Sequence, residues 1–115
     1  MIRPGQIYLA DLGEATPHPV LVVSREELNR GRTVLAVMIT SAKFAVRSQL
    51  ANCVPFYAGQ FGLTKDCVAQ CEYTIAAEVS DLDLAHGPIG TLDATTLRAV
   101  IKAIGYVMES DCEPL

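Results

Sequence analysis

The chain has 115 residues, half of them apolar, and a formal net charge of −4. This length suits a single domain, 1–115, and the apolar content argues against global disorder. No apolar run approaches the roughly 20 residues that span a bilayer, and Met1–Gly5 lacks the apolar stretch of a signal peptide. We therefore expect a cytoplasmic protein with no membrane partner.

The charges are distributed unevenly along the chain. Residues 1–65 carry seven Lys or Arg against four Asp or Glu, a balance of +3, and residues 66–115 carry two against nine, a balance of −7. The overall acidity argues against a sequence-blind polyanion binder. A nucleic-acid contact is expected on the first half of the chain, unless the clustering is only chance on a solvated surface.

The cysteines, Cys53, Cys67, Cys71 and Cys112, form no CxxC pair. Cys67 and Cys71 lie in a β-like stretch, where four residues span about 13 Å. That separation is too large for two sulfurs that must each lie about 2.3 Å from one zinc ion. We expect reduced, partly buried thiols, and neither a metal nor another cofactor.

Short apolar and β-branched runs predict six strands. They cover Gln6–Ala10, Val20–Val23, Thr33–Thr40, Leu50–Tyr57, Cys67–Glu72 and Ile89–Thr91. Pro55 confines the fourth to a sheet edge or a strand end. After the second, Ser24 and Glu27 match a capping box, which predicts a short helix that Gly31 stops. Residues 41–49 have no clear period and are expected to form a loop.

The clearest helix lies near the end of the chain. Asp93 can cap it, and apolar residues then recur at i, i+3, i+4 and i+7. This stripe comprises Leu97, Val100, Ile101, Ile104, Val107 and Met108. The tail Ser110–Leu115 is expected to fray. Many short strands followed by one segregated helix predict a mainly β, α+β fold, with an antiparallel barrel or sheet and a helix on one side.

The order of these segments resembles the MazF/PemK family of toxins from type II toxin–antitoxin systems. The matching pieces are Pro4–Leu12, His18–Ser24, Val37–Ser41, Gly62–Ala69 and Ile89–Asp93. The resemblance implies an SH3-like antiparallel barrel with a short inserted helix and a C-terminal helix, assembled as a homodimer. It also implies a metal-independent endoribonuclease that cleaves single-stranded RNA. Its inhibitor is expected to be an antitoxin protein whose acidic or extended tail covers the RNA site.

One related activity is not expected. Gyrase poisons share this fold, but they depend on a tryptophan near the C-terminus, and this chain has no Trp.

Cutting RNA without a metal ion requires a base for the 2′-hydroxyl, an acid for the leaving oxygen and donors for the phosphorane. In the family an arginine usually precedes the Pro-Val-x-Val strand, and here that residue is His18. A histidine grips a phosphate at fewer points and is only partly charged near neutral pH, yet it can act as a general acid or base. The alternative is an exposed loop residue between two prolines, with impaired activity.

Three further positions match functional positions of the family. Thr40 aligns with its active-site threonine, whose hydroxyl can donate to a phosphate oxygen; the alternative is an ordinary strand-ending threonine. Glu72 sits where some relatives have an acidic residue and can serve as the base, although a surface carboxylate on a strand is the commoner explanation. Gln70 replaces an arginine of some members, and we keep it as a candidate RNA contact.

Lys43 and Arg47 bracket Phe44 on the segment after the third strand. Cations with an interleaved aromatic residue are typical of single-stranded RNA grooves. All three are therefore predicted RNA contacts, although so short a segment also arises by chance. Alternatives for the same electrostatic role are Arg25, Arg30 and Arg32.

Two functions are consistent with these residues. In the first, an endoribonuclease toxin, His18 and Glu72 share the acid–base work while Thr40, Lys43 and Arg47 hold the phosphates. The second is a catalytically impaired family member, which kept the dimer and acts as an antitoxin- or nucleic-acid-binding module. The missing arginines and the acidic net charge point to the second. We favour the nuclease.

Overall fold

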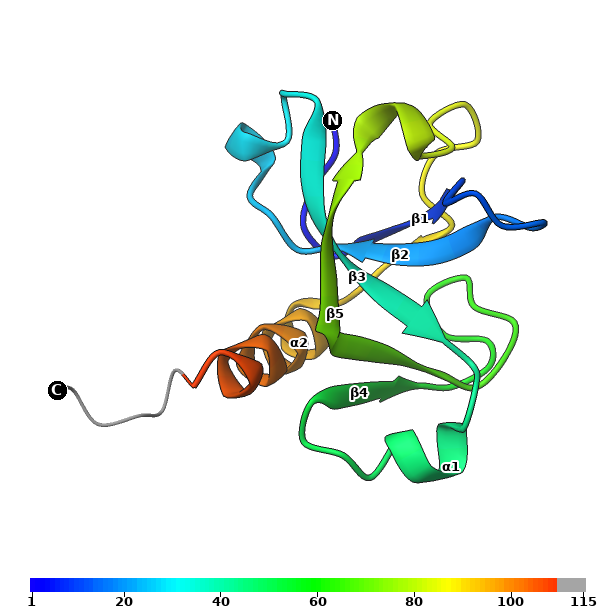
Figure 1. The fold of residues 1–115 in the computed structure, drawn as a ribbon, viewed down its shortest axis with the longest axis vertical. Helices are drawn as coiled ribbons and strands as arrows, with labels where there is room; N and C mark the ends of the chain where they lie inside the picture. The colour runs from blue at the N-terminus through cyan, green and yellow to red at the C-terminus, as the bar shows by residue number, and fades with distance from the viewer. Residues whose placement is uncertain (110–115) are drawn as a thin grey trace, which may run out of the picture.

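The computed structural model describes residues 1–109 and contains one antiparallel sheet with two α-helices (Figure 1). The strands are β1 (Gln6–Ala10), β2 (His18–Val22), β3 (Thr33–Thr40), β4 (Cys53–Phe56), β5 (Cys67–Glu78) and β6 (Gly90–Thr91). The helices are α1 (Phe44–Arg47) and α2 (Ala94–Val107), with 3₁₀ turns η1 (Glu26–Leu28) and η2 (Val79–Asp81). The expectations for Ser110–Leu115 and Cys112 fall outside the described residues.

The sheet has the order β4-β5-β3-β2-β1-β6 and curls into a half-barrel. Every pairing is antiparallel. The mainly β fold, with its short inserted helix and C-terminal helix, is confirmed. β4 lies at one edge, as Pro55 predicted, because proline has no N–H to give to a second neighbour. No helix within residues 1–109 is both long and apolar enough to cross a membrane.

β2 begins at His18, two residues before the predicted start of the strand at Val20. His18 pairs with Ala10 and Pro19 pairs with Leu9. Pro19 is accepted here because it lies at the beginning of the strand. The consequence is that His18 belongs to the sheet and not to the preceding loop, so its side-chain direction follows the alternation of the strand.

The two faces of the sheet are covered differently. α2 packs against β4 and β5 and contributes Val100 and Ala103 to a buried cluster. We call this side the helix-covered face, and its strand residues are Ile7, Leu21, Val37, Ile39, Phe56, Cys67, Ala69 and Cys71. The other side, the helix-free face, carries Tyr8, Ala10, Val20, Val22, Val34, Ala36, Met38 and Ala77. Residues from outside the strands, including Ile2, Leu12, Val79 and Leu82, complete that second cluster.

Three local predictions are corrected by the structure. The first concerns Ser24, which does not cap a helix. η1 follows Arg25 and has no side-chain cap. The Ser24 hydroxyl instead donates to Oδ1 of Asn29 and accepts the N–H of Leu35 at 3.0 Å. Ser24 and Asn29 are both buried, so the serine ties the turn to β3.

The second correction concerns residues 41–49, which contain the single helical turn α1. Lys43 adopts a left-handed φ of 53° immediately before it. The carbonyl of Lys43 then accepts the N–H of Arg47 at 2.9 Å. A single turn is too short to show an apolar period, which is why the sequence pattern indicated only a loop.

The third correction concerns the stripe on α2. The helix begins as predicted, because the Asp93 carboxylate accepts the N–H of Thr96 at 2.7 Å. Leu97, Val100 and Ile104 pack on the core together with Ala103. The exposed members of the predicted stripe are Ile101, Val107 and Met108. α2 packs mainly on β4 and β5, so the sheet covers a narrow strip of the helix.

Candidate functional site

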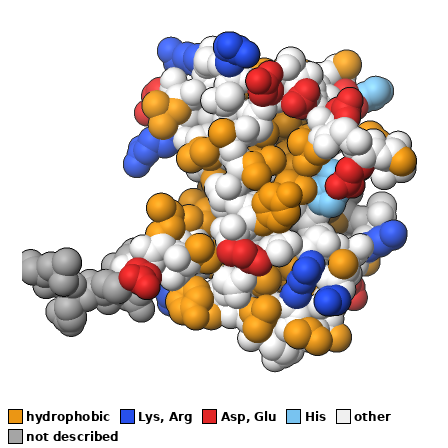
Figure 2. All heavy atoms as spheres, viewed as in Figure 1, with side chains coloured by type: hydrophobic (Ala, Val, Ile, Leu, Met, Phe, Trp, Pro, Cys, Tyr) orange, Lys and Arg blue, Asp and Glu red, His pale blue; other side chains and the backbone are white. Residues whose placement is uncertain are grey.

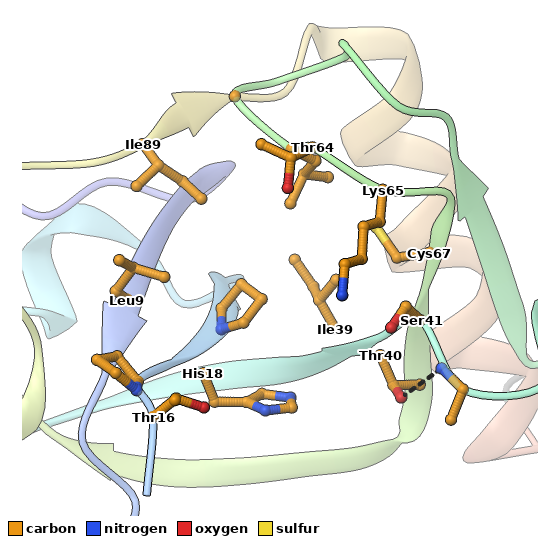
Figure 3. Close-up of a pocket in the computed structure, with 15 residues that line it drawn as sticks. Leu9, Thr16, His18, Ile39, Thr40, Ser41, Thr64, Lys65, Cys67 and Ile89 are labelled. Carbon is orange, nitrogen blue, oxygen red and sulfur yellow. Dashed lines mark hydrogen bonds between the residues drawn. The ribbon is translucent and has the colours of Figure 1, made fainter.

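A pocket of about 620 Å³ opens where β2 begins and β3 ends (Figure 3). Residues 16–19, 39–42 and 62–65 line it, together with Leu9, Cys67 and Ile89. His18 and Thr40, two of the three predicted catalytic residues, belong to this lining. The pocket therefore joins four parts of the chain that are far apart in sequence.

His18 and Thr40 lie next to each other across the β2–β3 pair. Val20 is opposite Met38 in this ladder, and moving two residues along each strand brings His18 level with Thr40. Residues directly opposite in an antiparallel pair have Cβ atoms about 4.5–5.5 Å apart on the same face. That face is the helix-free one, because Val20 and Met38 belong to its cluster. Figure 3 shows the His18 ring extending towards the end of β3 where Thr40 lies.

The imidazole of His18 has an unused polar atom. Its Nε2 is buried and has no hydrogen-bond partner among the described residues, while the residue as a whole is only partly buried. An unpaired buried polar nitrogen is costly, by about 1–3 kcal/mol, and such groups in folded proteins need a reason. A ligand that brings an acceptor or a donor to this ring satisfies the atom.

The hydroxyl of Thr40 is held in place and keeps its proton free. Oγ1 accepts the N–H of Ala42 at 3.2 Å, a turn that orients the side chain at the end of β3. A hydroxyl has one donor and two acceptor lone pairs. Since the Ala42 bond uses only an acceptor, the O–H can still donate to a phosphate oxygen.

Lys65 is a pocket residue that the sequence analysis did not select. It lies on the loop between β4 and β5 and lines the pocket with Thr64. In Figure 3 its side chain extends from that loop towards Ser41 and Thr40. It makes no ion pair within residues 1–109. The only sequence signal was its position in the Gly62–Ala69 segment, which resembles the family but does not by itself indicate a role.

A close backbone contact holds this loop over the pocket. Gly62 has a φ of +77°, and a Cβ at this position would lie 1.9 Å from the carbonyl oxygen of Ile89. A Cβ at Gly90 would in turn lie 1.8 Å from the carbonyl oxygen of Phe61. Only glycine allows both the left-handed backbone and so close an approach. The contact sets the positions of Lys65 and Ile89 on two sides of the pocket.

Glu72, the third predicted catalytic residue, lies outside the pocket lining, in a polar cluster on β5. Its carboxylate accepts hydrogen bonds from Asn52 at 2.7 Å and from Gln70 at 2.8 Å. Partial burial raises the pKa of Glu72, but the bonds from Gln70 and Asn52 and the charge of Arg47 outweigh this, and the pKa lies below its usual value. Glu72 is therefore a well-held carboxylate with a reduced proton affinity.

The cluster is on the same face of the sheet as His18. Gln70 is opposite Met38, whose other neighbour is Val20, so its side chain projects from the helix-free face. β3 lies between β2 and β5, and two strand spacings amount to about 10 Å. A direct contact between His18 and the cluster is excluded by this separation, but one strand of RNA can touch both.

The predicted RNA contacts on α1 lie beside this site, whereas Arg32 does not. Phe44 and Arg47 belong to α1, which follows the pocket residues Ser41 and Ala42. Figure 2 shows basic and apolar side chains together over α1, below a wider group of apolar side chains over β2 and β3. Arg32 precedes β3 at the end opposite to Thr40 and forms an ion pair of 3.7 Å with Glu78.

The three described cysteines are free thiols buried in the protein. Burial, with a contribution from Asp66, raises the pKa of Cys67 to about 11. Burial also raises the pKa of Cys71 to about 12. Within residues 1–109, no three His, Cys, Asp or Glu side chains are grouped so that they could hold a metal ion. The cysteines serve as small apolar residues of the core.

Comparison with known proteins places this geometry in a family. No curated protein sequence matches the chain. In solved structures, toxin MazF-mt6 of Mycobacterium tuberculosis is 30% identical with a TM-score of 0.75, and the match covers 90% of this chain and 96% of that one.

Two other solved structures show the same fold at lower identity. An endoribonuclease in complex with its cognate antitoxin from Mycobacterial species is 21% identical, with a TM-score of 0.77 and coverage of 99% and 100%. MazE–MazF (Form-II) from Deinococcus radiodurans is 14% identical, with a TM-score of 0.72 and coverage of 93% and 94%.

The family model described as "PemK-like, MazF-like toxin of type II toxin-antitoxin system" matches residues 3–108. Such a match takes in the whole sheet, the pocket and α2. The chain thus belongs to the PemK-like, MazF-like toxins of type II toxin–antitoxin systems.

Proposed function

We propose that this toxin is an endoribonuclease that cleaves single-stranded RNA without a metal ion and leaves a cyclic phosphate. The observation that carries the proposal is the meeting of His18 and Thr40 at the mouth of a pocket whose rim also holds Lys65. An imidazole, a hydroxyl donor and an ammonium group are the side chains that transesterification of a phosphodiester uses. Family membership supports the same activity, since related solved structures bear the name endoribonuclease.

His18 is the acid–base residue of this proposal. In the reaction the 2′-oxygen attacks phosphorus, the 2′-proton goes to a base, and the leaving 5′-oxygen receives a proton from an acid. Imidazole can do either task near neutral pH. The unpartnered Nε2 supports such a role, because a small rotation of the half-buried ring lets that nitrogen meet the substrate and removes the cost of leaving it unpaired.

Thr40 and Lys65 stabilise the charge that develops on the phosphorane. The Thr40 hydroxyl is oriented by the Ala42 N–H and has its proton available. Lys65 supplies the positive charge that relatives obtain from the arginine at the position of His18. Lys43 and Arg47, just beyond the pocket on α1, contact phosphates of neighbouring nucleotides.

Glu72 and Gln70 complete the RNA-binding face. Glu72 remains our candidate for the base that works with His18, although its lowered pKa makes it a weak one, because an efficient base has a pKa near the working pH. Its second role is to hold Gln70 and Asn52 in position, so that their amides present donors and acceptors to a nucleobase or a ribose of the RNA. Arg32, at the far end of β3, is a candidate contact for a longer RNA only.

The partners proposed for this toxin follow from its family. We place it in the cytoplasm as a homodimer, neutralised by an antitoxin with an acidic or extended tail. The cations that suit an RNA backbone, Lys43, Arg47 and Lys65, suit an acidic tail equally well. In a related mycobacterial endoribonuclease, a cognate antitoxin is present in the solved complex.

Cleavage of an oligoribonucleotide in EDTA tests the proposal. Wild-type protein should cut it and leave a cyclic phosphate, and His18→Ala should be slower by about 10²–10³, the loss that follows removal of one preorganised group. His86→Ala, which changes the only other histidine of the chain, is the matched control and should retain full activity. Equal cutting by wild type and His18→Ala would remove His18 from the mechanism.

The same assay decides between the two functions. An intact RNA after long incubation, together with tight binding of RNA or of an antitoxin tail, would identify an impaired family member that acts as a binding module. The absence of arginine at position 18 is the observation that keeps this alternative open.

A further inference from the structure

Two loops that border the pocket carry a pair of aromatic rings outside it. Phe44 lies on α1, two residues after the pocket residue Ala42. Tyr57 begins the loop between β4 and β5, which also carries the pocket residue Lys65, and is 52% exposed. The ring centroids are 5.8 Å apart with an interplanar angle of 77°, an edge-to-face contact. The ring contact thus joins α1 to the loop between β4 and β5, next to the pocket residues of both segments.

Hydrogen bonds within the loop keep Tyr57 in position. Its N–H donates to Oε1 of Gln60 at 2.9 Å, and the N–H of Ala58 donates to the Asp66 carboxylate at 2.9 Å. The N–H of Gly59 donates to the carbonyl of Leu63 at 2.8 Å. A ring on so well connected a loop loses little conformational freedom when a ligand stacks on it.

On the other side of the aromatic pair, α1 is held equally firmly. Its single turn is closed by the bond from Arg47 N–H to the Lys43 carbonyl, and the Arg47 guanidinium donates to the carbonyl of Ala42 at 3.3 Å. Phe44 is therefore preorganised as well.

The surroundings of the ring pair are cationic. Lys43 is exposed directly before Phe44, and Arg47 follows on the same turn. Neither forms an ion pair within the described part of the chain. Tyr57 is exposed and Phe44 is half-buried. Accessible aromatic faces beside cations are the combination that binds single-stranded nucleic acids, because every base has a face to stack and every nucleotide has a charge to neutralise.

We propose that Tyr57 and Phe44 form a stacking site for the base of the nucleotide adjoining the phosphodiester in the pocket, with Lys43 at its phosphate. This inference rests on the proposed function, since it places RNA at the same site. Phe44 follows the pocket residue Ala42 by two residues, so their Cα atoms lie at most about 7 Å apart. A base next to the bound phosphodiester therefore meets the rings without a long detour of the strand.

An internal reporter tests this site. The chain has no tryptophan, so Tyr57→Trp introduces a single indole whose fluorescence a stacked base quenches. The ligand is a short 2′-O-methyl oligoribonucleotide, which has no free 2′-hydroxyl and cannot be cut. Saturable quenching is expected for Tyr57→Trp. Tyr106→Trp, at a tyrosine of similar exposure on α2, is the matched control and should show none.

Affinity measurements give the size of the effect. Tyr57→Ala should weaken binding of the same oligonucleotide by about 5- to 100-fold, the loss typical of one stacked base, and Tyr57→Phe should bind like wild type. An abasic spacer at the stacked nucleotide should remove the difference between wild type and Tyr57→Ala. Thermal unfolding of each variant shows that the fold is retained.

Three results would overturn the stacking site. They are wild-type protein that does not bind the oligonucleotide, unchanged affinity in Tyr57→Ala, or a change of oligomeric state in Tyr57→Ala without loss of RNA affinity. The last result would assign the rings to a protein contact.

The proposal of a stacking site and the proposal of nuclease activity can be contradicted separately. If Tyr57-dependent binding is found but unmodified RNA stays intact, the stacking site stands and the nuclease fails. If RNA is cut and Tyr57→Ala binds and cuts like wild type, the reverse holds.

Discussion

The helix-covered and helix-free faces of the sheet are built from the same strands but differ in the residues that they carry at the strand ends. On the covered face, side chains such as Leu21, Val37 and Phe56 are fully buried beneath or beside α2. On the helix-free face, Val20 and Val22 are just as buried, but at the strand ends the same face carries His18 and Thr40. Because side chains alternate along a strand, one segment supplies both a core and a site.

The difference between the faces is a difference in what covers them. α2 closes the covered face from outside the sheet, and its residues pack directly on the strands. Residues from outside the strands cover part of the helix-free face. The polar residues His18 and Thr40 lie at its strand ends, beside a pocket whose lining also includes Ile39 and Cys67 of the helix-covered face. The buried residues of both faces are therefore expected to govern stability, and the polar residues at the strand ends to govern function. The following changes test how complete that separation is.

The largest expected effect is on the covered face. Phe56→Ala removes a fully buried ring and should lower the free energy of unfolding by about 3–5 kcal/mol. The matched change on the helix-free face, Thr40→Ala, removes one hydroxyl and its bond to Ala42 and should cost about 1 kcal/mol. Urea unfolding followed by circular dichroism measures both. Equal losses in the two variants would show that the buried ring of Phe56 contributes no more to stability than the Thr40 hydroxyl.

The second effect is at the junction between the faces, where the loop at Gly62 meets Ile89. Gly62→Ala places a Cβ 1.9 Å from a carbonyl oxygen at a left-handed φ and should cost roughly 2–4 kcal/mol. Gly59→Ala also has a left-handed φ, of +92°, but meets nothing within 4 Å, so only about 1–2 kcal/mol should be lost. The two melting temperatures measure the difference. If they coincide, the backbone contact does not hold the loop.

The third effect concerns binding alone. Lys65→Ala removes the ammonium group at the pocket and should weaken binding of a non-cleavable RNA roughly tenfold. It should also reduce the slope of log affinity against log salt by about one. Lys102→Ala, on the exposed surface of α2, is the control and should leave both quantities unchanged. Equal effects of the two substitutions would mean that RNA affinity depends only on net charge and not on where the lysine lies.

The smallest effect is a pH dependence at Glu72. Its pKa is lower in the folded protein than the usual 4.5, so its ionisation stabilises the fold above that pH and the contribution disappears as pH falls through the lower value. Because the residue is exposed, the contribution should be under about 1 kcal/mol.

Unfolding of wild type and Glu72→Gln at a series of pH values measures this contribution. The difference between the two free energies of unfolding should be constant above about pH 5 and should disappear below it. A difference that grows as the pH falls would contradict a lowered pKa of Glu72 in the folded protein.

Much of the sheet could be predicted because strand signals are local. β1, β3 and β6 lie where β-branched runs placed them, and the Asp93 cap starts α2 as expected. His18 and Thr40 could also be selected, because the segments that contain them resemble the MazF/PemK family at positions where it has functional residues. Their adjacency follows from the antiparallel register of β2 and β3, and a different register would have separated them.

Other parts of the site could not be predicted from local patterns. Ser24 has the spacing of a capping box but bonds to Asn29 and to Leu35 of β3, because the fold buries its hydroxyl beside them. Lys65 had no signal of its own, since its position depends on the contact between Gly62 and Ile89. Tyr57 likewise had no signal in the sequence, because only its contact with Phe44 makes it a candidate RNA contact.

The sequence by itself determined which residues can form strands and which end of the chain is helical. It also determined that an imidazole precedes one apolar run and that a hydroxyl ends another. The reason is that side-chain alternation, caps and turns depend on neighbours within a few residues. Only the tertiary structure decided which cation enters the pocket, which carboxylate is held by amides and which rings meet at the rim. These are contacts between loops distant in sequence, and they depend on how the sheet curls and where α2 closes it.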